Sequence, residues 1–245
     1  MSDTVPFEKC ASFINTQMQP GGSLGPGAEG IPRRVVTISR QAGCGAHIIA
    51  TKLAEYLQAH DTQTQGPWTV FDRNLVDKIL EDHQLPKRME KYMPEDKISE
   101  ITDIMDELFD LHPSSWMLVH KASETILRLA ALGNVIIIGR GANVITASLD
   151  QAFHVRLVAS REKQIERVRQ FDHLSDKAAA QFVGTQDLAR KRYLKKYFGK
   201  DIDDPLLYHV VINTDVVSFE TAVRMIGDAV LAMSPSPRRG LETPA

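Results

Sequence analysis

Residues 35–50 read VVTISRQAGCGAHIIA, and this stretch decides the fold. An apolar run with β-type residues enters a turn with two glycines and continues into a helical pattern, which is how many proteins hold a phosphate group. The phosphate-loop pattern G-x-x-x-x-G-K-[ST] is nevertheless broken. When the pattern is aligned on Gly45, Arg40 stands at its first glycine, Ala46 at its lysine and His47 at its hydroxyl residue. Taken alone, the stretch fits either a phosphate site that lacks its usual cation and magnesium ligand or a plain tight turn from a strand into a helix.

The composition is that of an ordinary globular protein. The chain has 245 residues, 43% of them hydrophobic and 24% charged, with a formal net charge of -2 and a pI near 6.4. This balance disfavours a surface built for nucleic acid or for an anionic membrane, so we expect any anion site to be local. No run approaches the roughly 18 apolar residues of a membrane span. Because Cys10 and Cys44 are too few for a disulfide framework or a cysteine zinc site, we expect a cytoplasmic protein.

The sequence predicts one folded domain between two irregular ends. Residues 1–32 finish in a run rich in Gly and Pro and are expected to form a flexible extension and linker. The domain is expected over residues 33–233, and residues 234–245 are expected to form a disordered tail.

Within this domain, short β-rich runs alternate with longer helical patterns. Such alternation is typical of a parallel sheet with helices on both faces. The expected strands are 35–38, 68–71, 135–138, 153–158 and 210–212. The expected helices are 46–60, 74–83, 97–111, 116–132, 161–171, 176–197 and 219–233, and the expected N-caps are Ser115, Ser160, Ser175 and Ser218.

Polar residues follow every expected strand. Ligands of parallel sheets lie at the carboxyl ends of the strands, so this rim is where we expect chemistry. The rim residues are Ser39, Arg40, Gln41, Asp72, Arg73, Gly139, Arg140, Gly141, Arg161, Asn213, Thr214 and Asp215. Several arginines and two aspartates at one rim fit a phosphate-rich ligand with a metal ion.

Two of these rim residues have an alternative interpretation. Asp72 can hold a magnesium ion through water or accept a proton from an acceptor phosphate, and it can equally cap the helix that begins near Asn74. Arg140 can be a solvated surface residue, but the glycines on either side of it favour a contact with a phosphate or a base.

Arg40 can supply the missing cation, because a guanidinium group binds phosphate well.

Basic residues and aromatic residues alternate through 161–200. This pattern fits a solvated helix face, a nucleic-acid surface, or a lid that closes over a transferring phosphoryl group. Asp187 and Arg190 are three residues apart and therefore share one helix face, either in a site or as a surface ion pair.

Five short motifs occur in a defined order along the chain. They are ISRQ-x-G-x-G at 38–45, FD-x-x-L at 71–75, IGRGA at 138–142, Arg161 with RV at 167–168, and VINT at 211–214. This ordered set resembles the cytidylate-kinase-like family, a branch of the P-loop nucleoside monophosphate kinases, over roughly residues 34–232. The resemblance implies a three-layer α/β sandwich of the P-loop NTPase class around a five-stranded parallel sheet. It also implies a helical acceptor-binding insertion near 84–115 and a lid near 171–205.

The resemblance also implies roles for individual residues. The residues implied to line the ATP phosphates are Gly43, Cys44, Gly45, Ala46 and His47, with Arg40 beside them. The residues implied to face the acceptor are Asp72, Arg73, Arg140, Asp187 and Arg190, and the catalytic candidates are Arg40, Asp72, Arg161 and Arg167. The chain departs from the family pattern at Cys44, Ala46 and His47, and it has Arg73 where cytidylate kinases tend to have a serine.

The implied activity is transfer of the γ-phosphoryl group of ATP to CMP or dCMP, with Mg²⁺ as cofactor and Asp72 as its ligand through water. A second hypothesis is a nucleotide-binding regulatory or sensor module that has kept the fold and lost turnover. A third is a kinase of the same fold for another small phosphorylated or hydroxyl acceptor. We expect no nucleic-acid or membrane partner, and the oligomeric state is left open.

Overall fold

A computed structural model of the chain describes residues 33–62, 66–72, 74, 101–105, 108 and 117–233. Its strands form one five-stranded sheet in the order β2-β3-β1-β4-β5. The strands are β1 (Val35–Arg40), β2 (Thr69–Phe71), β3 (Val135–Ile138), β4 (Ala152–Val158) and β5 (Val210–Asn213). All four pairings are parallel, with β1 between β3 and β4. The predicted fold class, a parallel α/β sandwich of the P-loop type, is confirmed.

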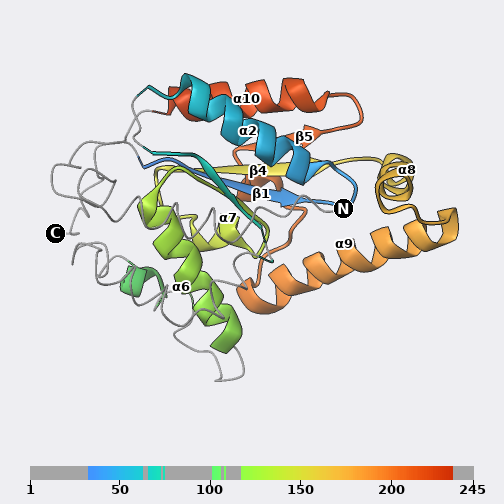
Figure 1. The fold of residues 1–245 in the computed structure, drawn as a ribbon. Helices are drawn as coiled ribbons and strands as arrows, with labels where there is room; N and C mark the ends of the chain where they lie inside the picture. The colour runs from blue at the N-terminus through green and yellow to red at the C-terminus, as the bar shows by residue number, and fades with distance from the viewer. Residues whose placement is uncertain are drawn as a thin grey trace.

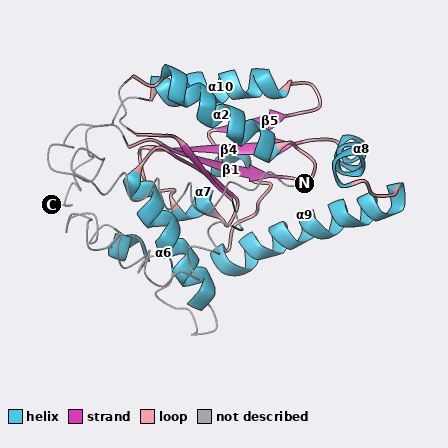
Figure 2. Ribbon diagram, in the orientation of Figure 1, coloured by secondary structure: helices cyan, strands magenta, loops and turns pink. Residues whose placement is uncertain are grey.

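Helices cover both faces of this sheet (Figure 1; Figure 2). They are α2 (Ala46–His60), α6 (Met117–Leu132), α7 (Ala142–Ile145), α8 (Arg161–Asp172), α9 (Asp176–Phe198) and α10 (Phe219–Ala232), with a short 3₁₀ helix η2 (Pro205–Leu207). Side chains alternate across the strands, so Val36 and Ile38 of β1 pack with α2 and α10. Val35 faces the opposite way, toward α6 and α7. Because both faces of β1 are buried, the carboxyl end of this strand is held at a fixed place in the sheet.

The strongly periodic segments agree with the expected elements to within about two residues. Strand β1 extends to Arg40 because Ser39 and Arg40 still pair with β4. The sequence did not predict α7 or η2, because helices of four and three residues show no helical period. The predicted N-caps Ser160, Ser175 and Ser218 each accept a backbone N–H of their helix and are confirmed.

Several expected features fall outside the described residues. They are the extension 1–32, helix 74–83 beyond Asn74, Arg73, most of helix 97–111, the insertion 84–115 apart from 101–105 and 108, Ser115, and the tail 234–245. Within the described ranges, no helix has both the length and the apolar character that a membrane crossing requires.

Candidate active site

The loop between β1 and α2, residues 41–47, is called here the glycine loop. Gly43 and Gly45 adopt left-handed φ angles of 70° and 72°. A Cβ atom on Gly43 would lie 2.6 Å from the carbonyl oxygen of Gln164, and one on Gly45 would enter the ring of Phe219. Both positions therefore require glycine for conformation and for space. Helix α2 begins after Gly45 with no side-chain cap and no acidic residue in its first turn, so its N-terminal amides suit an anion.

The glycine loop is supported from behind by Arg167 of α8. Its guanidinium donates to the hydroxyl and carbonyl oxygens of Thr214 at 2.9 and 2.7 Å and to the carbonyl of Gly43 at 3.3 Å. The same group lies 5.3 Å from the ring centre of Phe219. These contacts join the loop to the start of α10, so in the structure Arg167 supports the loop.

Cys44 is enclosed within the glycine loop. The residue is 1% exposed, and burial together with the charge of Asp187 raises the pKa of its thiol to about 11. The thiol is therefore neutral at physiological pH. A neutral, buried thiol is a packing group and a poor nucleophile.

Helix α9 contacts the glycine loop through Asp187. One carboxylate oxygen, Oδ1, accepts the backbone N–H of Ala42 at 2.7 Å and the Nη1 of Arg190 at 2.7 Å. The side chains of Asp187 and Arg190 are each about a quarter exposed. Burial lowers the pKa of Arg190, and the neighbouring Asp187 opposes that shift. The predicted pair on one helix face is thus formed, and it is joined to the loop.

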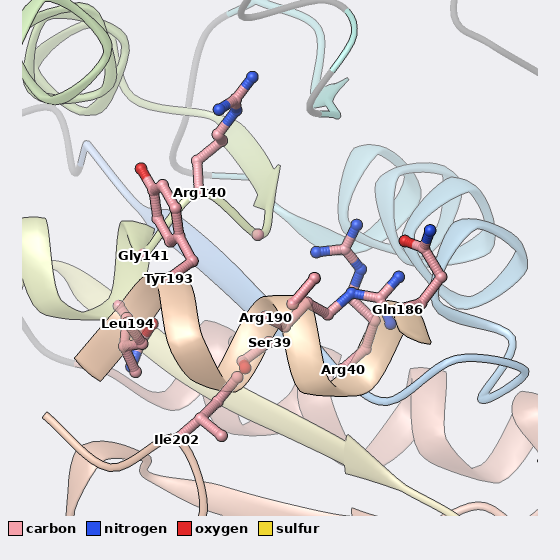
Figure 3. A pocket seen from close by; sticks show the side chains of 12 residues that line it. Ser39, Arg40, Arg140, Gly141, Gln186, Arg190, Tyr193, Leu194 and Ile202 are labelled. Carbon is pink, nitrogen blue, oxygen red and sulfur yellow. The ribbon is translucent and has the colours of Figure 1, made fainter. Parts of the chain in front are cut away.

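Arg40 reaches across the end of β1 to the turn after β3. The backbone of Gly139, at φ 83°, lies directly under its guanidinium, and a Cβ atom there would collide with Nη1. The next residue, Arg140, is itself left-handed at φ 54°, and Gly141 follows at φ 72°. Figure 3 shows Arg140 extending away from Arg40 and Arg190. This turn therefore places the two arginines, 40 and 140, in different directions from one rim.

Asp72 at the end of β2 and His47 at the start of α2 interact electrostatically. Asp72 follows β2 directly and is 8% exposed. Partial burial lowers the pKa of His47, Asp72 opposes this shift, and the positive charges of Arg40 and Arg190 add to it. His47 is therefore neutral at pH 7, so the positive charge at this end of the loop comes from arginine.

A cavity of about 280 Å³ lies between the rim and α9; we call it the first cavity (Figure 3). Its apolar wall comes from Tyr193, Leu194 and Ile202, and its charged wall from Arg40, Arg140 and Arg190. Neutral polar groups complete it, namely Ser39, Asn143 and Gln186. The site thus combines an aromatic wall, three guanidinium groups and amide side chains.

The structure does not gather every predicted residue around this cavity. Arg161, the first residue of α8, is exposed and donates to the carbonyl oxygen of Ala180 in α9 at 3.4 Å. Neither Arg161 nor Arg167 lines the first cavity. Among the described residues, no group of three or more His, Cys, Asp or Glu side chains could hold a metal ion without a substrate.

Sequence reasoning missed two residues near the site. Arg156 of β4 is 4% exposed and donates to Ser39 Oγ at 2.9 Å and to Asp203 at 3.1 Å. Asn143 of α7 is 6% exposed and lines the first cavity, and its Nδ2 has no hydrogen-bond partner among the described residues. A charged residue inside the apolar run AFHVRLV was the available signal for Arg156. Asn143 gave none, because a four-residue helix cannot be read from the sequence.

A glycine loop between the central strand and a helix, with arginines along the same rim, defines an α/β protein of the P-loop type. The chain belongs to the cytidylate kinase-like family, whose sequence model matches residues 35–216. The family predicted from the ordered motifs is thereby confirmed, and with it a kinase-like class.

Two solved structures are similar to this chain, and the first of them shows that the fold is shared. An uncharacterized protein from Eubacterium ventriosum matches with a TM-score of 0.54 and 18% identity, covering 81% of this chain and 99% of that chain. A shikimate kinase from Bacteroides thetaiotaomicron matches with a TM-score of 0.43 and 12% identity, covering 80% of this chain and 98% of its own. No curated protein matches the chain in sequence.

Proposed function

We propose that this protein transfers the γ-phosphoryl group of ATP to a nucleoside monophosphate, with CMP or dCMP as acceptor and CDP or dCDP as product. The observation that carries the proposal is that Arg40, Arg140 and Arg190 all line one cavity beside the glycine loop. The family match supports the reaction class. Phosphoryl transfer asks mainly for positioning and for positive charge, and this rim offers both.

The donor nucleotide belongs on the glycine loop. The amides of Gly43 to His47 and the N-terminus of α2 would hold the ATP phosphates. Arg40 leaves the end of β1 at the point where the loop begins, and its guanidinium would supply the charge that a lysine supplies in the usual pattern. The loss of the lysine at Ala46 is offset in this way.

The acceptor belongs in the first cavity. Arg140 and Arg190 would bind its phosphate, and the wall of Tyr193 and Leu194 would pack against its base and sugar. Helix α9, which carries Arg190 and Tyr193, would close the site over both nucleotides and keep water out. Exclusion of water favours transfer to the acceptor over hydrolysis of ATP.

Asp72 is the described carboxylate that fits a magnesium ion delivered with ATP. Magnesium is usually held by one or two carboxylates, with waters and substrate phosphates as its other ligands, so a cluster of protein ligands is not required. Asp72 stands at the end of β2, within electrostatic reach of His47 at the start of α2. When bound, the ion would neutralise charge on the transferring group.

The proposal is tested with the purified chain, ATP, Mg²⁺ and a panel of nucleoside monophosphates, with ADP as the readout. We expect ADP formation that depends on CMP or dCMP. ATP binding without ADP formation from any acceptor would contradict an enzyme. That result would favour the regulatory module, which is the second candidate because Ala46 stands where the phosphate-loop pattern has its lysine. Turnover with a different phosphorylated or hydroxyl acceptor would favour a kinase for that compound.

Arg140→Ala tests the assignment of the acceptor. We expect kcat/KM for the acceptor to fall about 100-fold, which is the loss of one charged contact, while the Kd for ATP changes by less than about 2-fold. Arg169→Ala is the matched control, because Arg169 is an exposed arginine of α8 that pairs with Asp176. Equal losses in ATP binding and acceptor use would contradict the assignment.

A further inference from the structure

A second cavity, of about 250 Å³, lies on the other side of Arg40 and Arg190. It shares these two arginines and Ile202 with the first cavity. The residues that line only the second cavity are Gln41, Arg156, Asp187, Leu188, Lys191 and Asp203. No residue of 43–47 lines it, so it is separate from the amides expected to hold the donor phosphates.

Positive charge predominates on the wall of the second cavity. Arg40 comes from β1, Arg156 from β4, and Arg190 and Lys191 from α9, against the two carboxylates Asp187 and Asp203. Each carboxylate is already shared. Asp187 accepts from Ala42 and Arg190, as described above, and Asp203 accepts from Arg156 at 3.1 Å and Lys191 at 2.9 Å. Lys191 also lies 3.7 Å from Asp201, which does not line the cavity, so the four cations of the wall face three carboxylates and one excess positive charge is left for a bound anion to compensate.

Arg156 is buried at 4% exposure, so it has the largest free-energy cost of desolvation among these cations. Its guanidinium lies on the sheet face beneath the cavity and donates to Ser39 Oγ, which Tyr208 also contacts through its hydroxyl at 3.3 Å. Burying a guanidinium carries a desolvation penalty, and an apolar residue in a β-strand would avoid it. The charge of Arg156 also lowers the pKa of Arg190, because the fold holds these two like charges close together. Such an arrangement favours binding of an anion between them.

We propose that the second cavity binds a phosphate dianion, either free or as the end of a compact phosphomonoester, beside the donor nucleotide and not as part of it. Guanidinium and ammonium groups from three elements match the oxygens of a phosphate. A volume of about 250 Å³ holds a phosphate with its nearest waters. The proposal does not depend on turnover, because binding alone defines the site.

Calorimetry tests the proposal, first on the free protein and then on protein saturated with a non-hydrolysable ATP analogue. Inorganic phosphate is the probe in one arm, and ribose 5-phosphate, as a compact phosphomonoester, is the probe in the other. We expect, in both states, a phosphate whose binding weakens in Lys191→Gln, which distinguishes it from any phosphate held at the acceptor site of the first cavity. Tighter binding of ribose 5-phosphate would identify a phosphomonoester as the preferred ligand. Tighter binding of inorganic phosphate would identify the free ion as the preferred ligand.

Variants with opposite expected signs separate a binding site from damage to the fold. Lys191→Gln removes a half-exposed cation and should weaken phosphate binding about 10-fold, whereas Asp203→Asn removes a carboxylate and should strengthen it. Lys196→Gln, an exposed lysine of the same helix that lines neither cavity, should change nothing. Absence of phosphate binding, complete competition by the ATP analogue, or equal effects of Lys191→Gln and Lys196→Gln would overturn the proposal.

Discussion

The carboxylate of Asp187 accepts the backbone N–H of Ala42 at 2.7 Å, although 145 residues separate the two in sequence. An anionic side chain thus binds an amide at the start of the glycine loop, where a phosphate oxygen would otherwise find a donor. The same oxygen holds Arg190. A phosphate that bound this amide would therefore have to compete with a negative charge that belongs to the protein.

Replacement of Asp187 should reveal this competition. Asp187→Asn keeps the size of the side chain and removes its charge, so we expect ATP, measured without acceptor, to bind about 5-fold more tightly, equivalent to roughly 1 kcal/mol. Equilibrium dialysis or calorimetry measures the change. Asp176→Asn, at the exposed first residue of the same helix, is the control and should leave the Kd unaltered. Weaker ATP binding by Asp187→Asn would show instead that the contact holds the loop in its binding conformation.

Gly139 should be required for the placement of Arg40. A methyl group at Gly139 would displace the Arg40 guanidinium, so Gly139→Ala and Arg40→Ala should each lower kcat by about 10- to 100-fold. The double variant should lose little more than either single variant, because both changes remove the same group. Steady-state kinetics on the four proteins of this cycle gives the answer. Losses that multiply would mean that the two residues act independently.

Gly45 should be sensitive for two separable reasons, and Gly199 isolates one of them. Gly45 and Gly199 have φ angles of 72° and 69°, but a Cβ atom on Gly199 would meet nothing within 4 Å. We expect Gly199→Ala to cost about 1 kcal/mol of unfolding free energy from backbone strain alone. Gly45→Ala should cost about 2 kcal/mol more, because its methyl group overlaps Phe219. Urea denaturation measures both, and partial recovery of Gly45→Ala by Phe219→Leu would identify the ring as the cause.

His154 should make the protein acid-sensitive. Burial, together with the positive charge of protonated His209, lowers the pKa of His154 to about 4, and its ring bonds Thr37 at 2.8 Å. The unfolded chain takes up this proton near pH 6.5, so unfolding binds a proton between the two values. Stability should therefore fall by up to about 3 kcal/mol as the pH drops from 6.5 to 4. Denaturation across this range should show a flatter slope for His154→Gln, and an unchanged slope would contradict this account.

Periodicity predicted the layers of this fold well and the small elements poorly. The strand of Val135–Ile138 and the helix of Ala46–His60 were predicted to the residue, since a buried parallel strand is uniformly apolar and an amphipathic helix repeats every 3.6 residues. The short helix that presents Asn143 was not predicted, because its backbone is set by the left-handed turn Gly139–Arg140–Gly141. Such a turn depends on what packs around it.

The candidate site shows the same limit in its arginines. The family resemblance implies that Arg161 and Arg167 stand near the phosphates, which stays a prediction, and six residues along a helix correspond to well over one turn. The two side chains consequently diverge, one onto α9 and the other behind the glycine loop. Arg156 was missed for the opposite reason, since a strand pattern assigns it to a face without showing that Ser39 of β1 lies beside it.

The position of Phe219 in the sequence affects when the glycine loop can fold during synthesis of the chain. The ring beneath Gly45 belongs to the first residue of the last helix, and the bonds from Arg167 end on Thr214 just before it. A chain still being synthesised carries the sequence of the glycine loop long before it carries the residues that shape it. We therefore expect nascent chains that end before Phe219 to lack the folded glycine loop, and with it the proposed site for ATP.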